Sequence, residues 1–323
     1  MPHIPTYDFI VIGAGSAGCT VAAGLAKAGR VAVVEAGPSD AHPFVKIPFA
    51  LIWLMGSRRD WQFKSAPQAA LGGRQIAIPR GKMLGGSGSI NSMVWFRGRA
   101  DDFDTWNVPG WAWADVEPAF EAVEARLNPT VFNDPHPSVE KLGWLFGANS
   151  PAGPTPERES GGVFRFNMRG NRRWSAADAY LRPAMADGVQ VLPGRQVARI
   201  GFDGDVARRV HFTDGSQINA HRGIVLSAGT IGSPAVLLQS GVGPADDLRA
   251  AGVTVHTDAP GVGANLHDHP GAGLHFTGNG GYGLTAGQAA HWLAAPLNYA
   301  LRRKGRLASP TVEGGMFFNA AGT

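Results

Sequence analysis

The first 35 residues constrain the fold most, because they have the pattern of a strand, a glycine-rich turn, a helix and a second strand. The apolar run Tyr7–Ile12 is typical of a strand that is buried on both faces of a parallel sheet. It is followed by the turn Gly13–Gly18, by small residues at 19–28 that predict a helix, and by a second apolar run at 30–34. This order predicts an α/β fold in which two parallel strands are joined by a crossover helix.

The turn carries three glycines whose spacing suits a bound dinucleotide. Gly13 permits the tight turn, Gly15 lets the backbone approach a pyrophosphate, and Gly18 lets the helix pack closely on the strand. The N–H groups at the start of the helix, next to Ser16 and Ala17, lie at the positive end of its dipole and favour phosphate. The pattern predicts a dinucleotide site, with a purely structural glycine turn as the alternative.

Glu35 directly follows the second expected strand. A carboxylate at this position can accept hydrogen bonds from the hydroxyls of an adenosine ribose. It would also repel a 2′-phosphate, so NADP is disfavoured. These residues leave the choice between NAD and FAD open.

The sequence after Glu35 favours FAD, because an NAD-binding domain would continue with further strand–helix units. Residues 37–79 instead hold Pro and Trp without a regular period. Sheet-like segments return only at 189–192, 197–202 and 223–227. A sheet interrupted by long excursions suits a flavin cofactor, whose ring system needs a second wall.

Four ordered blocks of the sequence resemble the glucose-methanol-choline (GMC) oxidoreductase family. They are the glycine turn with EAGP at 35–38, RGKMLGGS at 80–87 with its continuation to Gly98, the segment 228–244, and the segment 261–270. The blocks follow one another at spacing similar to that of the family. The resemblance implies an α/β fold with a three-layer, Rossmann-like FAD-binding domain and a discontinuous, incomplete α+β substrate domain. It assigns residues 1–125 and 187–272 to the FAD-binding domain, and 126–186 and 273–323 to a truncated part of the substrate domain.

The resemblance and the glycine pattern together predict the residues that bind FAD. The loop Gly85–Gly88 has little side-chain bulk and several N–H groups, which suits phosphate oxygens or the polar edge of a flavin, although a plain glycine turn has the same composition. Ser233–Pro234 is expected to start a helix after this site. The predicted FAD-binding residues are Gly13, Gly15, Ser16, Ala17, Gly18, Glu35, Ala36, Arg80, Met83, Gly85, Gly86, Ser87, Asn91, Ser92, Met93, Val94, Val197, Ala228 and Gly229.

Two expectations, the role of Val197 and the way FAD is attached, depend on single positions that are compared with the family. Val197 matches a family position whose backbone faces the adenine, but a simple core valine is a comparable interpretation. Members that attach FAD covalently can carry a histidine just before the position of Asn91, where this chain has Ile90. The resemblance therefore implies noncovalent FAD.

The family oxidises a small-molecule alcohol by moving a hydride from its CH–OH group to flavin N5, while a histidine takes the hydroxyl proton. That histidine and its His or Asn partner lie beyond the position of Thr323, so no catalytic residue is carried over to this chain. Glu313 matches a glutamate that lines the substrate cavity in choline-acting relatives, with a surface glutamate at a strand edge as an equal alternative. The electron acceptor stays open between O2 and a quinone or other acceptor. A non-catalytic FAD-binding fragment and a lyase of the same family are the competing functions.

Composition and charge argue against several other classes. The net charge of +4 without a basic block does not indicate nucleic-acid binding. Cys19 is the only cysteine, which excludes an intrachain disulfide and a thiolate metal cluster, and His267–His269 lacks a third metal ligand beside it. The most apolar stretch, Phe44–Met55, is interrupted and too short to span a membrane. Met1–Thr6 lacks the pattern of a secretory signal, so a cytoplasmic protein is expected.

Overall fold

The computed structural model describes residues 4–136, 139, 141, 153–269, 271, 273–274 and 289–318. The chain divides into two compact units. The first unit comprises Met1–Asp40, Met55–Ser89 and Ala176–Thr277, and the second comprises Ala41–Leu54, Ile90–Ser175 and Gly278–Thr323, each so far as it is described.

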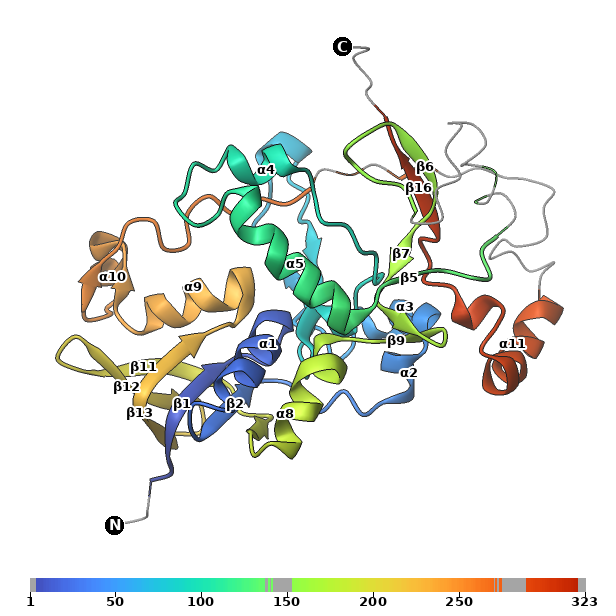
Figure 1. Cartoon of the computed structure of the whole chain (residues 1–323). Coiled ribbons are helices and arrows are strands. Elements are labelled where there is room, and N and C mark those ends of the chain that lie inside the picture. The colour runs from blue at the N-terminus through green and yellow to red at the C-terminus, as the bar shows by residue number, and fades with distance from the viewer. Residues whose placement is uncertain are drawn as a thin grey trace. The chain divides into compact units, whose positions relative to one another are not determined.

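A six-stranded, mostly parallel sheet forms the centre of the first unit, with the order β10-β2-β1-β13-β12-β11 (Figure 1). β10, β2, β1 and β13 pair in parallel, whereas β12 pairs antiparallel with β13 and with β11. The strands are β1 (Thr6–Ile12), β2 (Val31–Glu35), β10 (Gln190–Pro193), β11 (Val197–Asp203), β12 (Val206–Phe212) and β13 (Gln217–Leu226). The sheet confirms the predicted α/β class.

Each face of this sheet carries its own apolar cluster, because successive residues of a strand point to opposite faces. Ile10 and Ile12 join a cluster to which helix α9 (Gly229–Gln239) contributes Val236. Val11 lies in the other cluster, together with Cys19 of α1 (Ser16–Leu25) and residues of α8 (Arg182–Ala186). The glycine turn between β1 and α1 is therefore held between two buried elements.

The remaining elements of the first unit are short and lie in its loops. They are β3 (Phe63–Lys64), the 3-10 helix η2 (Ala69–Leu71), β4 (Ala77–Ile78), the 3-10 helix η3 (Gly86–Ser89), the π-helix η4 (Ala177–Leu181), β14 (Val242–Gly243), α10 (Ala245–Ala250) and β15 (Thr257–Asp258). β3 and β4 form an antiparallel hairpin, and β14 and β15 pair in parallel.

Two helices begin earlier than the sequence patterns predicted. α1 starts at Ser16 instead of residue 19, directly after Gly15 as its N-cap. α9 starts at Gly229 instead of Ser233, and Pro234 lies inside its first turns. The N-termini of both helices therefore lie directly at the strand ends, where their N–H groups are available to a ligand.

The second unit is built from short strand pairs and helices around Phe166, Met168 and Tyr299. Its antiparallel pairs are β16 with β6, β5 with β7 and β8 with β9. Its elements are α2 (Pro43–Lys46), η1 (Pro48–Ala50), α3 (Leu51–Leu54), α4 (Ala100–Asp104), α5 (Trp113–Leu127), β5 (Thr130–Val131), β6 (Ser160–Val163), β7 (Arg165–Phe166), β8 (Met168–Arg169), β9 (Arg172–Arg173), α11 (Ala289–Arg302), η6 (Arg306–Ala308) and β16 (Gly314–Phe317). β16 begins directly after Glu313.

The two compact units follow the predicted domain ranges only in part. Residues 41–54 and 90–125, which were expected in the FAD-binding domain, belong to the second unit, and residues 176–186 belong to the first. Parts of the predicted substrate domain, at 137–138, 140, 142–152, 275–288 and 319–323, lie outside the described residues. The functional assignment of the domains stays a prediction. Within the described residues, no helix combines the length and apolar character needed to cross a bilayer.

Candidate functional site

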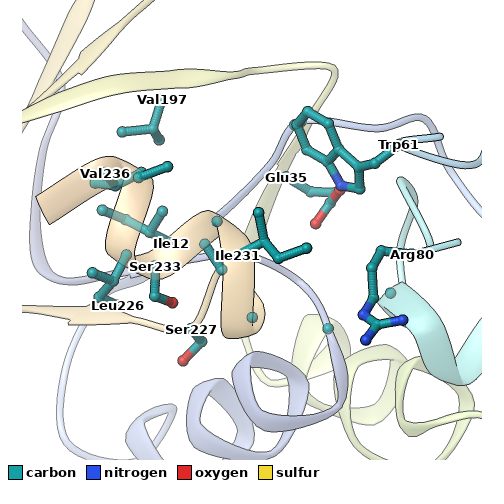
Figure 2. Close-up of a pocket in the computed structure, with 18 of the residues that line it drawn as sticks. Ile12, Glu35, Trp61, Arg80, Val197, Leu226, Ser227, Ile231, Ser233 and Val236 are labelled. Atoms are coloured by element: carbon teal, nitrogen blue, oxygen red, sulfur yellow. The ribbon is translucent and has the colours of Figure 1, made fainter. Parts of the chain in front are cut away.

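A cavity of about 650 Å³ opens in the first unit at the carboxyl ends of β1, β2 and β13. Ile12, Glu35 and Leu226, which end these three strands, all line it. Figure 2 shows Ile12, Leu226 and Val236 gathered together, apart from Trp61 and Arg80. In open α/β sheets, ligands bind outside the carboxyl ends of the strands, so this is the position that the fold favours for a ligand.

The three glycines of the first turn differ in what surrounds them. A Cβ on Gly13, whose φ is +96°, would lie 2.5 Å from the Ser227 carbonyl oxygen, and a Cβ on Gly18 would lie 1.9 Å from the Gly13 carbonyl oxygen. These two glycines are required by packing within the protein. A Cβ on Gly15 would meet nothing within 4 Å, although Gly15 lines the cavity. The bare backbone at Gly15 leaves room for a ligand at the N-terminus of α1.

Glu35 is buried, with 7% of the residue exposed, and its carboxylate ties two backbone segments together. One oxygen accepts a hydrogen bond from the Ala14 N–H at 2.9 Å, and the other accepts one from the Gly37 N–H at 2.9 Å. Burial raises the pKa of Glu35, against the opposing effects of these N–H groups and of the Lys82 charge. Each oxygen keeps a further lone pair for a hydroxyl donor in the cavity.

The second glycine segment packs directly on the first turn. The Gly85 N–H donates to the Ala14 carbonyl oxygen at 2.7 Å, and a Cβ on Gly86, at φ +54°, would lie 2.8 Å from the Gly15 Cα. The Ser87 hydroxyl accepts a hydrogen bond from the Gly81 N–H at 3.2 Å. Two segments about 70 residues apart in the sequence, which the sequence patterns treated as separate glycine motifs, thus form one wall of the cavity.

The junction between β13 and α9 forms another wall of the cavity. Gly229 has φ +81°, and a Cβ there would meet nothing within 4 Å. Ala228, Gly229 and Ser233 line the cavity together with Ile231 and Val236. The start of α9 therefore offers bare backbone and an apolar surface to the same space as α1.

The structure gathers most of the predicted FAD-binding residues of the first unit around this cavity. Gly18, Met83 and Gly85 do not line it, because Gly18 packs on Gly13, Met83 is fully buried and Gly85 hydrogen-bonds Ala14. The predicted residues that line the cavity are Gly13, Gly15, Ser16, Ala17, Glu35, Ala36, Arg80, Gly86, Ser87, Val197, Ala228 and Gly229.

Asn91, Ser92, Met93 and Val94 belong to the second unit. The Asn91 side-chain oxygen accepts hydrogen bonds from the Met93 N–H at 3.0 Å and from Arg173 Nη1 at 2.8 Å. Met93 is buried at φ +61°, an unusual conformation for a residue with a side chain. These contacts show that Asn91 shapes its own loop, and its contact with a cofactor stays a prediction.

Glu313 also lies in the second unit, just before β16. Its carboxylate accepts a hydrogen bond from the His136 N–H at 2.6 Å, and its carbonyl oxygen accepts one from the Phe164 N–H at 3.0 Å. The side chain is partly buried, so the interpretation as a plain surface glutamate is incomplete. Its role toward a substrate stays a prediction.

Several residues that line the cavity were not predicted from the sequence. Arg195 places its guanidinium 4.3 Å from the centre of the Phe212 ring, and its Nε is buried without a hydrogen-bond partner among the described residues. Trp61 and Phe63 stack with their ring centres 5.5 Å apart. Arg195 follows a strand, and Trp61 and Phe63 lie in the irregular segment 37–79, so no local sequence pattern marks these three residues. Only the folded chain brings them to the strand ends.

Two other residues with reactive or charged side chains, Cys19 and Asp268, do not line the cavity. Burial raises the pKa of Cys19 to about 12, so its thiol is not nucleophilic at neutral pH. Asp268 pairs with Arg80 at 3.2 Å. No group of three or more potential metal-binding side chains occurs in the part of the chain that the structure describes.

Comparisons with known proteins agree on one family. A family model described as GMC oxidoreductase matches residues 7–271. An oxygen-dependent choline dehydrogenase from Rhizobium johnstonii is 39% identical over 289 residues, which cover 81% of this chain and 52% of the relative. The chain thus spans about half the length of the curated relatives it matches.

Two solved structures resemble the fold. Pyridoxine 4-oxidase from Mesorbium loti matches with a TM-score of 0.69 and 30% identity, covering 78% of this chain and 55% of the other. An FAD-dependent oxidoreductase from Chaetomium thermophilum matches with a TM-score of 0.78 and 25% identity, covering 95% of this chain and 61% of the other.

Proposed function

The chain belongs to the GMC oxidoreductase family, and we propose that its cavity binds FAD for the oxidation of a small-molecule alcohol. The family binds FAD, which makes the first unit the Rossmann-like cofactor domain in this proposal. The observation that carries it is the pairing of open backbone at Gly15 with the buried carboxylate of Glu35 in one cavity. Pyrophosphate and ribose hydroxyls need these two features at this separation along a βαβ unit.

The residues that line the cavity fit such a cofactor. The N-termini of α1 and α9 supply N–H groups for phosphate oxygens, and Arg80 adds a positive charge. The buried Arg195 Nε has a hydrogen to donate to a polar ligand atom. A volume of about 650 Å³ lies within the range of cofactor pockets. Glu35 would repel a 2′-phosphate, which disfavours NADP.

We propose that the bound FAD is held noncovalently, because Ile90 offers no nucleophile for attachment. When bound, FAD supplies the acceptor for the hydride that leaves the substrate CH–OH carbon, at flavin N5. The residues of this chain hold that cofactor by hydrogen bonds, dipoles and apolar contacts. The names of the two relatives, a choline dehydrogenase and a pyridoxine 4-oxidase, favour a substrate with a primary alcohol.

The residues that would take the proton of the substrate hydroxyl are not assigned in this chain, so activity is a proposal for the whole protein. Glu313, anchored by the His136 N–H, is the candidate to face a cationic substrate. The electron acceptor is O2 or a quinone-type compound, and we expect the protein in the cytoplasm. A non-catalytic FAD-binding fragment and a lyase of the same family are the alternatives.

An absorbance spectrum of the purified chain, before and after denaturation, tests the cofactor. A flavin spectrum that is released into solution on denaturation supports noncovalent FAD, whereas flavin that stays with the precipitated chain contradicts it. Anaerobic addition of choline or pyridoxine to the FAD-loaded protein then tests the reaction. Loss of the flavin absorbance indicates oxidation of the alcohol, and an unchanged spectrum favours the lyase or the non-catalytic fragment.

A further inference from the structure

Helix α11 of the second unit turns a row of leucine side chains to the solvent (Figure 1, red). Leu293, Leu297 and Leu301 are four residues apart, so they lie on one side of the helix, and they are 83%, 65% and 74% exposed. The opposite side packs into the core of the unit through the buried residues Ala295 and Tyr299. From 292 to 301 the helix carries no charged residue. A contiguous apolar patch of this kind marks an interaction site.

Aromatic side chains extend this patch from α11 to α3. The Trp292 ring of α11 lies 4.9 Å from the Phe49 ring, and the Phe49 ring lies 6.0 Å from that of Trp53, measured between ring centres. Trp53 is 49% exposed, and the exposed Phe44 ring lies 5.3 Å from it. The exposed side chains that we call the apolar surface of the second unit are Phe44, Ile52, Trp53, Leu293, Leu297 and Leu301.

The apolar surface lies on the most one-sidedly basic part of the sequence. The two segments that carry it, 41–54 and 289–312, contain no Asp or Glu. Five basic residues and no acidic one give these segments a charge of +5, although the whole chain has only +4, so the remainder is nearly neutral. The basic residues are Lys46, Arg302, Arg303, Lys304 and Arg306. Three of them directly follow the last leucine of the row and are exposed.

Two of these cations are held against aromatic rings. The Arg303 guanidinium lies 4.9 Å from the centre of the Tyr299 ring, and that of Arg306 lies 5.0 Å from the centre of a Trp292 ring. The Asp134 carboxylate also reaches this end of α11, where it accepts a hydrogen bond from the Gly305 N–H at 2.8 Å and offsets part of the charge. The positive charge is therefore fixed at the end of the leucine row.

We propose that the apolar surface docks on an anionic lipid bilayer. The leucines and Trp53 enter the boundary between headgroups and acyl chains, while the cations after Leu301 meet the lipid phosphates. Tryptophan suits this boundary because it joins a large apolar ring to a polar N–H. With 14 residues, α11 lies on the membrane and is too short to span it. This inference goes beyond the proposed function, since it concerns the second unit and needs no cofactor.

Co-sedimentation of the purified chain with lipid vesicles tests the proposal. Vesicles of phosphatidylglycerol and phosphatidylcholine in equal amounts should bind the chain at least about tenfold more strongly than vesicles of phosphatidylcholine alone, because several cations meet anionic headgroups. The difference should shrink when the salt is raised from about 0.1 M to about 1 M, which shortens the Debye length from about 10 Å to about 3 Å.

A leucine variant tests the apolar contribution. Leu293→Ser combined with Leu297→Ser removes two exposed side chains that would enter the lipid, so it should weaken binding to the anionic vesicles at least about tenfold. Leu71→Ser combined with Val206→Ser is the matched control, at 38% and 48% exposed residues of the first unit, and should bind within about threefold of the unchanged chain.

A charge variant tests the electrostatic contribution. Arg302→Gln combined with Lys304→Gln removes two exposed cations and leaves the ring contacts of Arg303 and Arg306 in place. It should weaken binding to the anionic vesicles roughly tenfold at low salt and much less at high salt. Lys27→Gln combined with Lys64→Gln, at exposed positions of the first unit, is the control and should stay within about threefold.

Three results would overturn the proposal. The first is that the unchanged chain fails to bind the anionic vesicles, or binds both kinds of vesicle equally. The second is that the leucine variant binds like the unchanged chain. The third is a dimer, seen by sedimentation velocity without vesicles, that the leucine variant loses, because the surface would then belong to a second copy of the chain. None of these results bears on FAD binding, so the proposed function is tested separately.

Discussion

The Glu35 carboxylate accepts a hydrogen bond from the Ala14 N–H at 2.9 Å and so ties the end of β2 to the glycine turn at the end of β1. The same carboxylate holds the Gly37 N–H, and a Cβ on Gly37 would lie 1.9 Å from the Lys82 carbonyl oxygen. One buried side chain therefore joins the first turn to the backbone that leads to the second glycine segment. The residue predicted to recognise a ribose is also a structural link in its own site.

This dual role predicts a pH dependence of stability. Burial raises the pKa of Glu35 above its ordinary value of 4.5, so in the window above that value the folded state binds more protons than the unfolded state. The contribution of Glu35 is therefore fully present below about pH 4.5 and falls as the pH rises through the folded-state pKa. Urea unfolding of the unchanged protein and Glu35→Gln across this window measures it. The unfolding free energy of Glu35→Gln should fall less steeply with pH, and equal slopes would show that Glu35 does not carry the effect.

Packing around Gly18 predicts a loss of stability on adding a single methyl group. Gly18→Ala puts a Cβ 1.9 Å from the Gly13 carbonyl oxygen, which the turn cannot absorb without shifting. We expect a loss of about 1–3 kcal/mol in the free energy of unfolding, as for other overpacked sites. Gly24→Ala in the same helix is the control, since its Cβ meets nothing within 4 Å, and it should stabilise by about 0.5–1 kcal/mol. Equal urea midpoints for the two variants would contradict the packing shown here.

A buried charge cluster predicts another large effect. Arg182 contacts Asp40 at 2.5 Å and Asp178 at 2.6 Å, and these carboxylates are 0% and 7% exposed. Arg182→Met removes the guanidinium from both, which should cost about 2–3 kcal/mol, less than for a fully buried pair because Arg182 is itself 42% exposed. The matched variant Arg99→Met breaks an exposed pair with Asp101 and should cost less than about 1 kcal/mol. Thermal or urea unfolding of both variants decides whether burial matters in this way.

Cys19 gives a chemical measure of how firmly the first helix is packed. Its side chain is buried and its pKa is raised to about 12 by that burial, so almost no thiolate exists near neutral pH. A thiol-specific reagent should label the folded chain very slowly and the urea-unfolded chain at the rate of a free cysteine. Rapid labelling under native conditions would mean that α1 opens readily from the sheet.

The sequence patterns predicted the local part of this site well. The strand at Thr6–Ile12, the glycine turn and Glu35 follow one another within one βαβ unit, so their order already dictates their proximity. The helix starts were less accurate, because the N-caps Gly15 and Ala228 have no side-chain cap that would mark them. The family comparison confirms the predicted GMC resemblance.

The non-local part could not be predicted in the same way. Strand β12 was missed, since its three basic residues hide an alternating pattern in which Val210 and Phe212 are buried. Trp61 and Arg195 reach the cavity through the hairpin and through contacts with β12, which no spacing in the sequence reveals. The predicted FAD-binding residues are also divided between the two compact units, with Asn91–Val94 in the second.

Titration of FAD into the purified chain, followed by calorimetry, tests the central claim most directly when Gly15→Val is compared with Gly24→Val. A side chain at Gly15 would enter the cavity, whereas one at the exposed Gly24 would not. If the cavity holds the pyrophosphate, Gly15→Val loses FAD affinity by at least about tenfold, while Gly24→Val binds like the unchanged protein. Equal FAD affinity in the two variants would contradict the assignment of this cavity to the cofactor.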